Sequence, residues 1–140
     1  MLIKRENELS SEEIAEKWLR KAYTDLRVAV KLFEIGEEPW VIVFHAQQAV
    51  EKALKAYLVL HNRHFGKTHN LFRLIDLCSE IDQEFQQLHE LEIDKLYPLA
   101  IEARYPDTGI EITIDEAKEA IEKARIAISF ITRKIKSKKS

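Results

Sequence analysis

The fold is decided by the stretch Phe44-His-Ala-Gln-Gln-Ala-Val-Glu-Lys-Ala-Leu-Lys-Ala-Tyr-Leu58, whose periodicity is strongly helical. At about 100° per residue its apolar side chains form one broad arc together with Val43, the residue before the stretch. The arc consists of Val43, Val50, Leu54, Tyr57 and Leu58. Gln47 falls near the middle of this arc and Glu51 at its shoulder. A buried polar group without a partner costs about 1–3 kcal/mol. We therefore expect Gln47 and Glu51 to be hydrogen-bonded to another helix, or to face a cleft or a subunit interface.

A second stripe on the opposite side of this helix is wholly polar, and it consists of His45, Gln48, Lys52 and Lys55. Two interpretations are open: a solvated helix face, or a functional surface. Asp25 lies at the edge of the apolar stripe of the preceding helix, within reach of this one. We expect Asp25 to pair with Lys52 or Lys55, or with another donor nearby, and to serve structure rather than function.

Composition favours one helical domain over residues 1–140, with an ordered core from about 11 to 135. Three Gly and three Pro leave little material for turns between many strands, and 46% hydrophobic residues argue against disorder. No apolar run approaches the roughly 18 residues of a membrane span, and the charged amino terminus is unlike a signal peptide. We expect a cytoplasmic protein without membrane contact. The single cysteine, Cys78, shares an apolar helical face and is expected in the core.

Local signals place the helix boundaries. Ser10 and Glu13 form a capping box before a helix from about 11 to 35, which Gly36 ends. Pro39 opens a second helix that reaches about 61. The remaining boundaries are a third helix from the cap Thr68 to about Ile81, a fourth from Gln83 to about Arg104 with Asp82 as its cap, and a last helix capped by Thr113 or Asp115. Pro98 interrupts the fourth helix near Tyr97. These signals predict an all-α, antiparallel up-and-down bundle of four to five helices.

Charge is distributed unevenly along the chain. Residues 80–122 contain thirteen acidic and three basic side chains, whereas residues 123–140 contain seven basic and no acidic ones. A short basic tail suits the carboxyl end of a helix, where cations offset the helix dipole. This explanation is favoured over nonspecific duplex binding.

Four motifs in this order carry a family resemblance: Trp18 with Ala22-Tyr-Thr-Asp-Leu26, the block Phe44 to Lys55, Lys67-Thr-His-Asn-Leu71 and Arg104-Tyr-Pro-Asp107. The chain resembles the HEPN-domain family over about residues 12–135. The resemblance implies a helical bundle that dimerises and is often encoded beside a minimal nucleotidyltransferase as a toxin–antitoxin pair. Some relatives are metal-independent endoribonucleases, and others bind nucleotides or act as partners of the transferase.

The ribonuclease relatives have an arginine followed, after four to six residues, by a histidine. Arginine holds the scissile phosphate and histidine moves the proton of a 2′-hydroxyl. Here Arg104 is in the expected late position, but residues 105–111 contain no histidine. Arg63 and His69 have an allowed spacing, yet they lie in a loop, and about one such pair is expected by chance. The motif is therefore broken.

The candidate ligand-binding residues lie around Arg104, with Tyr105 and Asp107 after it and Tyr97 on the same helix side. Arginine can hold a phosphate, and a tyrosine can hydrogen-bond or stack on a base. Further candidates are Lys52, Lys55 and His69, the last beside an expected helix start that favours anions. Alternatively, Arg104 caps its helix. The five histidines have no metal-ligand spacing, so we expect neither metal nor cofactor.

Three functions are compatible with the sequence. The favoured one is a module that binds nucleotide or RNA phosphate and is the toxin-like partner of a minimal nucleotidyltransferase. The alternatives are a metal-independent endoribonuclease toxin and a non-catalytic oligomerisation protein. We also expect a homodimer, because Trp40, Phe44 and the segment 97–105 offer more aromatic surface than a small bundle needs.

Overall fold

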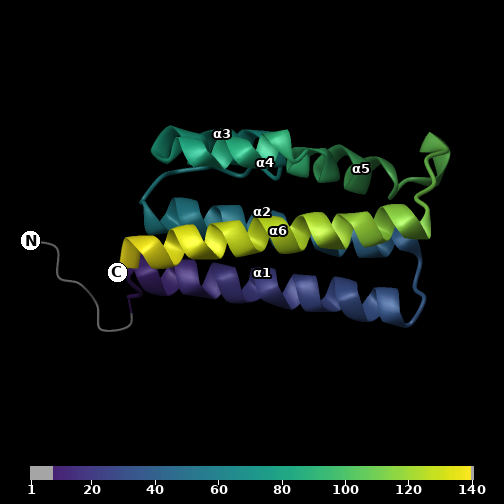
Figure 1. The fold of residues 1–140 in the computed structure, drawn as a ribbon, viewed down its shortest axis with the longest axis horizontal. Coiled ribbons are helices and arrows are strands. Elements are labelled where there is room, and N and C mark those ends of the chain that lie inside the picture. The colour runs from purple at the N-terminus through teal and green to yellow at the C-terminus, as the bar shows by residue number, and fades with distance from the viewer. Residues whose placement is uncertain (1–7, 140) are drawn as a thin grey trace, which may run out of the picture.

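Long helices lie side by side along the protein, and shorter helices cover them on one side (Figure 1). The computed structural model describes residues 8–139, which contain no strand; residues 1–7, with most of the charged amino terminus, and residue 140 lie outside it. The helices of this part are α1 (Ser11–Glu34), α2 (Pro39–Leu60), α3 (Leu71–Ile81), α4 (Gln86–Glu90), α5 (Leu96–Glu102) and α6 (Ile114–Lys139), with 3₁₀ turns η1 (Gln83–Phe85), η2 (Ile93–Lys95) and η3 (Pro106–Thr108). Helices α1, α2 and α6 run the length of the bundle, whereas α3 packs beside α2 and the chain then turns at η1, so that α4 runs back along α3 before η2 and α5. The predicted all-α antiparallel bundle is confirmed.

Helices α1 and α2 form a hairpin whose ends follow from local chemistry. The Ser10 hydroxyl accepts from the backbone N–H of Glu13 at 3.1 Å, and the Glu13 carboxylate accepts from the N–H of Ser10 at 3.4 Å. After α1, Gly36 has φ 76°, a conformation that side chains other than glycine disfavour. Pro39 is the first residue of α2, where a missing N–H removes no intrahelical bond. The expected capping box, glycine stop and proline start are all present.

Helix α2 is the central element of the bundle, packed against α1, α3, α5 and α6. Its buried residues therefore lie on every side of the helix rather than on one stripe. The core around it includes Cys78 of α3, whose thiol donates to the carbonyl of Leu54 at 3.8 Å. Burial raises the pKa of the Cys78 thiol well above its usual value. The expected core position of Cys78 is confirmed.

The third helix starts later than its sequence predicts. Asn70, not Thr68, is its N-cap: the Asn70 side-chain oxygen accepts from the backbone N–H of Phe72 at 2.9 Å and of Arg73 at 3.4 Å. Thr68 instead accepts from the N–H of Asn70 at 3.2 Å and shapes the loop before the cap. His69 therefore lies in a loop outside the helix.

The segment expected as one fourth helix is divided. The chain breaks at Glu92, which has φ 60°, and not at Pro98. Pro98 is the third residue of α5, within the first turn, where its missing N–H removes no intrahelical bond. The prediction of a single interrupted helix was therefore wrong about the place of the interruption. The short helices are held along the bundle by buried apolar residues, which are Phe85, Leu88, Ile93, Leu96 and Ala100.

Asp82, between α3 and η1, connects these short elements to α6. Its carboxylate accepts from the backbone N–H of Glu84 at 3.0 Å, which confirms the predicted cap, and from Lys134 Nζ at 2.7 Å. The hydrogen bond from Lys134 lowers the pKa of the Asp82 carboxyl below its ordinary value.

Helix α6 closes the bundle. Its cap is Thr113 rather than Asp115, because Thr113 and Glu116 form a capping box with bonds of 3.0 and 3.1 Å. The basic segment expected as a tail is helical as far as Lys139. None of the helices between residues 8 and 139 is long and apolar enough to cross a membrane.

Candidate functional site

A buried polar network runs along α2. Gln47 and Glu51 are each 3% exposed and Lys55 is 5% exposed. The Glu51 carboxylate accepts from Gln47 Nε2 at 3.1 Å, from Lys55 Nζ at 3.0 Å and from His69 Nδ1 at 2.9 Å. The expectation that these partners come from another helix was wrong: two lie on α2 itself and the third in the α2–α3 loop. Helical spacing of four residues brings the first two into reach.

Lys55 is not part of a solvated stripe. Its Nζ lies 5.7 Å from the ring centroid of Trp18 on α1 and 5.3 Å from that of Phe65 in the α2–α3 loop. The two rings meet edge to face at 6.4 Å. Cation–π contacts and the Glu51 carboxylate therefore satisfy the ammonium group inside the fold. The structure leaves Lys55 no open surface on which to receive a ligand.

Lys52 is the partner of Asp25. Its ammonium group forms an ion pair with the Asp25 carboxylate, which also lies 3.3 Å from His45 Nδ1. The Asp25 side chain is 13% exposed, so this ion pair is partly buried between α1 and α2. Lys52 thus has a structural partner.

A pocket of about 240 Å³ lies between α2 and α5. It draws on three separate segments: α2, the α2–α3 loop, and α5 with the residues directly after it. Its lining residues are Phe44, Gln47, Gln48, His69, Tyr97, Ala100, Ile101 and Arg104. Among the predicted ligand-binding residues, Tyr97, His69 and Arg104 therefore come together, and Lys52 and Lys55 do not.

Arg104 is held at this pocket by aromatic rings. Its guanidinium carbon lies 5.3 Å from the ring centroid of Phe44 and 5.8 Å from that of Tyr105. Tyr105 is 51% exposed and is not one of the pocket-lining residues. Asp107 is in η3 and exposed, outside the lining as well. The sequence cluster Arg104, Tyr105 and Asp107 is thus divided, with only the arginine facing the pocket.

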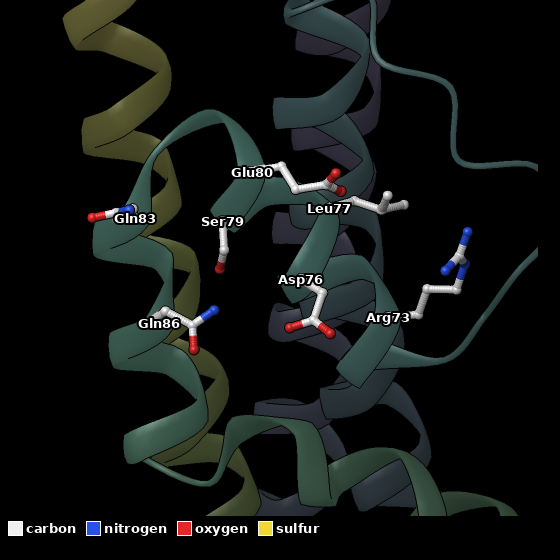
Figure 2. A pocket seen from close by; sticks show the side chains of 7 residues that line it. All are labelled: Arg73, Asp76, Leu77, Ser79, Glu80, Gln83 and Gln86. Carbon is white, nitrogen blue, oxygen red and sulfur yellow. The ribbon is translucent and has the colours of Figure 1, made fainter.

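A larger but more open hollow, of about 770 Å³, lies over α3 and α4 (Figure 2). Its two carboxylates already have partners within the fold: Asp76 with His89 at 2.9 Å, and Glu80 with Arg63 at 3.2 Å. In Figure 2, Arg73 extends away from the other polar side chains of the hollow. None of the predicted ligand-binding residues lines it. Because a well-formed pocket with a few convergent polar groups marks a site better than an open hollow does, we favour the smaller pocket.

Residues 8–139 contain no group of three or more histidine, cysteine, aspartate or glutamate side chains placed to hold a metal ion. The groups that line the pocket include a cation, two amides, an imidazole and a phenol. Arg104 can grip an oxyanion, and Tyr97 can donate or accept a hydrogen bond.

Sequence reasoning missed three pocket residues as site residues: Phe44, Ala100 and Ile101. The last two follow Tyr97 by three and four residues, so they share its helix face with Arg104. That spacing was a usable signal for both. The role of Glu51 in holding His69 had no local signal, because the two residues meet only when the α2–α3 loop folds back over α2.

The described residues thus form an all-α bundle in which Arg104, directly after a short helix, lines a pocket against the central helix α2. The chain belongs to the HEPN domain family, whose characteristic sequence pattern matches residues 15–135. A solved structure, TT1696 from Thermus thermophilus, is similar with a TM-score of 0.70 and 28% sequence identity, covering 86% of this chain and 97% of that one. No curated protein sequence matches the chain.

Proposed function

We propose that the pocket between α2 and α5 binds the phosphate of a nucleotide or of RNA without cleaving it, as the toxin-like partner of a minimal nucleotidyltransferase in a two-gene system. The observation that carries the proposal is that Arg104, Tyr97 and His69, from separate segments, line one pocket. A guanidinium binds phosphate bidentately, and a phenol hydrogen-bonds or stacks on a base. Membership of the family supports a nucleotide-related role, and a nucleotidyltransferase in the neighbouring reading frame would support the pairing.

Ile101→Glu tests the pocket. Ile101 is 37% exposed and lines the pocket beside Arg104, so a carboxylate there adds a negative charge where a phosphate has to bind, without disturbing the core. Like charges brought together cost enough to weaken binding by at least about tenfold. Calorimetric titration with AMP measures the change in affinity, and thermal unfolding confirms that the variant is folded.

The matched control is Ile126→Glu. Ile126 is 48% exposed on α6, outside the pocket, and the same substitution there should leave the affinity for AMP unchanged. Equal losses of affinity in the two variants would place binding elsewhere. Absence of any nucleotide or RNA binding by the native protein would overturn the proposal and leave the non-catalytic oligomerisation role.

A metal-independent endoribonuclease is the second candidate, and one observation favours it. His69 lines the same pocket as Arg104, although it does not follow that arginine in the sequence. Its Nδ1 lies 2.9 Å from the buried Glu51 carboxylate, so Nε2 is left for a ligand. An imidazole held by a carboxylate can act as a general base. The pocket contains only one imidazole, however, and cleavage needs both a base and an acid.

Labelled total RNA incubated with the protein and EDTA separates these two functions. We expect binding without cleavage. Cleavage by the native protein that is lost in both Arg104→Ala and His69→Ala would replace the proposed function by the ribonuclease. Cleavage that persists in both variants would indicate a contaminating nuclease.

We propose in addition that the protein is a homodimer. Large apolar side chains are exposed near the loop between α5 and α6, among them Trp40 at 39%, Tyr105 at 51% and Ile114 at 47%. Apolar surface of this kind is characteristic of an interface. Light scattering during gel filtration at tens of micromolar should give twice the mass of one chain, and the mass of a single chain would contradict the prediction.

A further inference from the structure

The buried carboxylate of Glu51 determines which atoms face the pocket. An ionised carboxylate only accepts hydrogen bonds, so each of its three partners has to donate. Gln47 must therefore turn its NH₂ group, and His69 its Nδ1–H, toward Glu51. Because the Glu51 side chain is 4% exposed, water cannot easily replace these donors.

The hydrogen-bond directions that Glu51 imposes also fix the orientation of Gln48. With the NH₂ group of Gln47 on Glu51, the Gln47 carbonyl oxygen accepts from Gln48 Nε2 at 3.0 Å. Rotation of the Gln48 amide by half a turn would place two carbonyl oxygens against each other. The orientation of Gln48 is thus determined by Glu51 through Gln47, and within residues 8–139 its carbonyl oxygen has no hydrogen-bond donor.

The side of the pocket formed by α2 and the α2–α3 loop consequently presents hydrogen-bond acceptors. Gln48 Oε1 is one of them, and in the neutral imidazole His69 Nε2 is the other, because Nδ1 carries the hydrogen. Arg104, which also lines the pocket, is a cation that only donates. A ligand complementary to the whole pocket carries an anion for Arg104 and N–H donors for Gln48.

We propose that the pocket selects nucleotides whose base bears an amino group at C6 of a purine or C4 of a pyrimidine, as adenine and cytosine do, with Gln48 Oε1 accepting from that amino group. The inference rests on the proposed function, since it assumes that a nucleotide phosphate occupies the Arg104 side. A glutamine amide matches an amino group beside a ring nitrogen. Hypoxanthine and uracil place a carbonyl oxygen at the same position, opposite the oxygen of Gln48, and two facing acceptors repel.

Two matched ligand pairs test the inference, AMP against IMP and CMP against UMP, each titrated calorimetrically into the full chain. In each pair the two ligands share ribose and phosphate, and they differ at the amino position and in the adjacent ring nitrogen, which carries a hydrogen only in IMP and UMP. We expect AMP and CMP to bind roughly tenfold more tightly than IMP and UMP, the effect of one hydrogen bond made or lost.

Two variants separate base recognition from general damage. Gln48→Ala removes the acceptor and should bring the affinity ratios of AMP to IMP and of CMP to UMP close to one. Gln47→Leu leaves Gln48 in place but removes the carbonyl oxygen that fixes the Gln48 amide, which is then free to rotate. We therefore expect the same loss of selectivity, although Gln47 itself does not contact the base. The control Gln87→Ala changes an exposed glutamine of α4 outside the pocket and should preserve both ratios.

Each result distinguishes the inference from the proposed function. Equal binding of AMP and IMP by the native protein would overturn the amino selectivity and leave phosphate binding intact. Selectivity that survives in Gln48→Ala would also overturn it, because another group would then read the base. If none of the four nucleotides binds, the proposed function fails together with the inference.

Discussion

Glu51→Ala is expected to lower the free energy of unfolding by about 3–5 kcal/mol, the cost of removing one partner of a buried ion pair. Lys55 is 5% exposed and its ammonium group lies between two aromatic rings, so it cannot reach water without repacking them. The variant also leaves Nε2 of the buried Gln47 without its acceptor. Urea denaturation followed by circular dichroism measures the loss.

Three further variants locate the cause of this loss. Adding Lys55→Met to Glu51→Ala removes the stranded charge and should recover much of the stability. Gln47→Leu should cost only about 1 kcal/mol, because Glu51 keeps two donors. Glu119→Ala, which breaks an exposed pair with Lys123, should change stability by less than about 1 kcal/mol. If Glu51→Ala unfolds at the same urea concentration as the native protein, the network has no structural role.

Arg104→Ala should weaken the binding of AMP or of RNA by about ten- to a hundredfold, the range for losing a hydrogen-bonded charge. The Phe44 and Tyr105 rings hold the guanidinium in place before a ligand arrives, which reduces the entropy lost on binding. Arg104 is exposed, so the variant should fold normally. Calorimetric titration measures the affinity, and the native value should fall as salt rises.

Two controls test this interpretation of Arg104. Arg104→Lys keeps the positive charge but loses the planar fork of donors, and its affinity should lie between those of the native protein and of Arg104→Ala. Arg125→Ala removes an exposed arginine of α6, which pairs with Glu122 at 3.9 Å, and should bind AMP normally. An unchanged affinity in Arg104→Ala would show that the phosphate binds elsewhere.

The helix ends that could be predicted are those set by contacts within a few residues. The Ser10–Glu13 capping box, the left-handed Gly36 and the leading Pro39 all involve the backbone of their own turn. Such signals do not depend on the rest of the fold. Periodicity likewise identified the apolar faces, because a helix has the same period wherever it lies.

Local signals failed where packing, and not the preference of single residues, set a helix boundary. Thr68 and Asn70 are both good caps, and Glu92 is not a residue that disfavours a helix as strongly as Pro98 does. Packing made the decision in each case. The short helices η1, α4 and η2 pack on the bundle through the buried residues Phe85, Leu88 and Ile93. The break at Glu92 lies immediately before Ile93.

By itself the sequence determined the helical class, the α1–α2 hairpin and the presence of polar residues inside the apolar face of α2. Only the tertiary structure decided what those residues do. Periodicity describes one helix and cannot show that the loop carrying His69 folds back onto Glu51, or that the end of α5 brings Arg104 to the same pocket. These contacts join residues distant in the chain, and they form only because burial of the apolar faces packs the helices together.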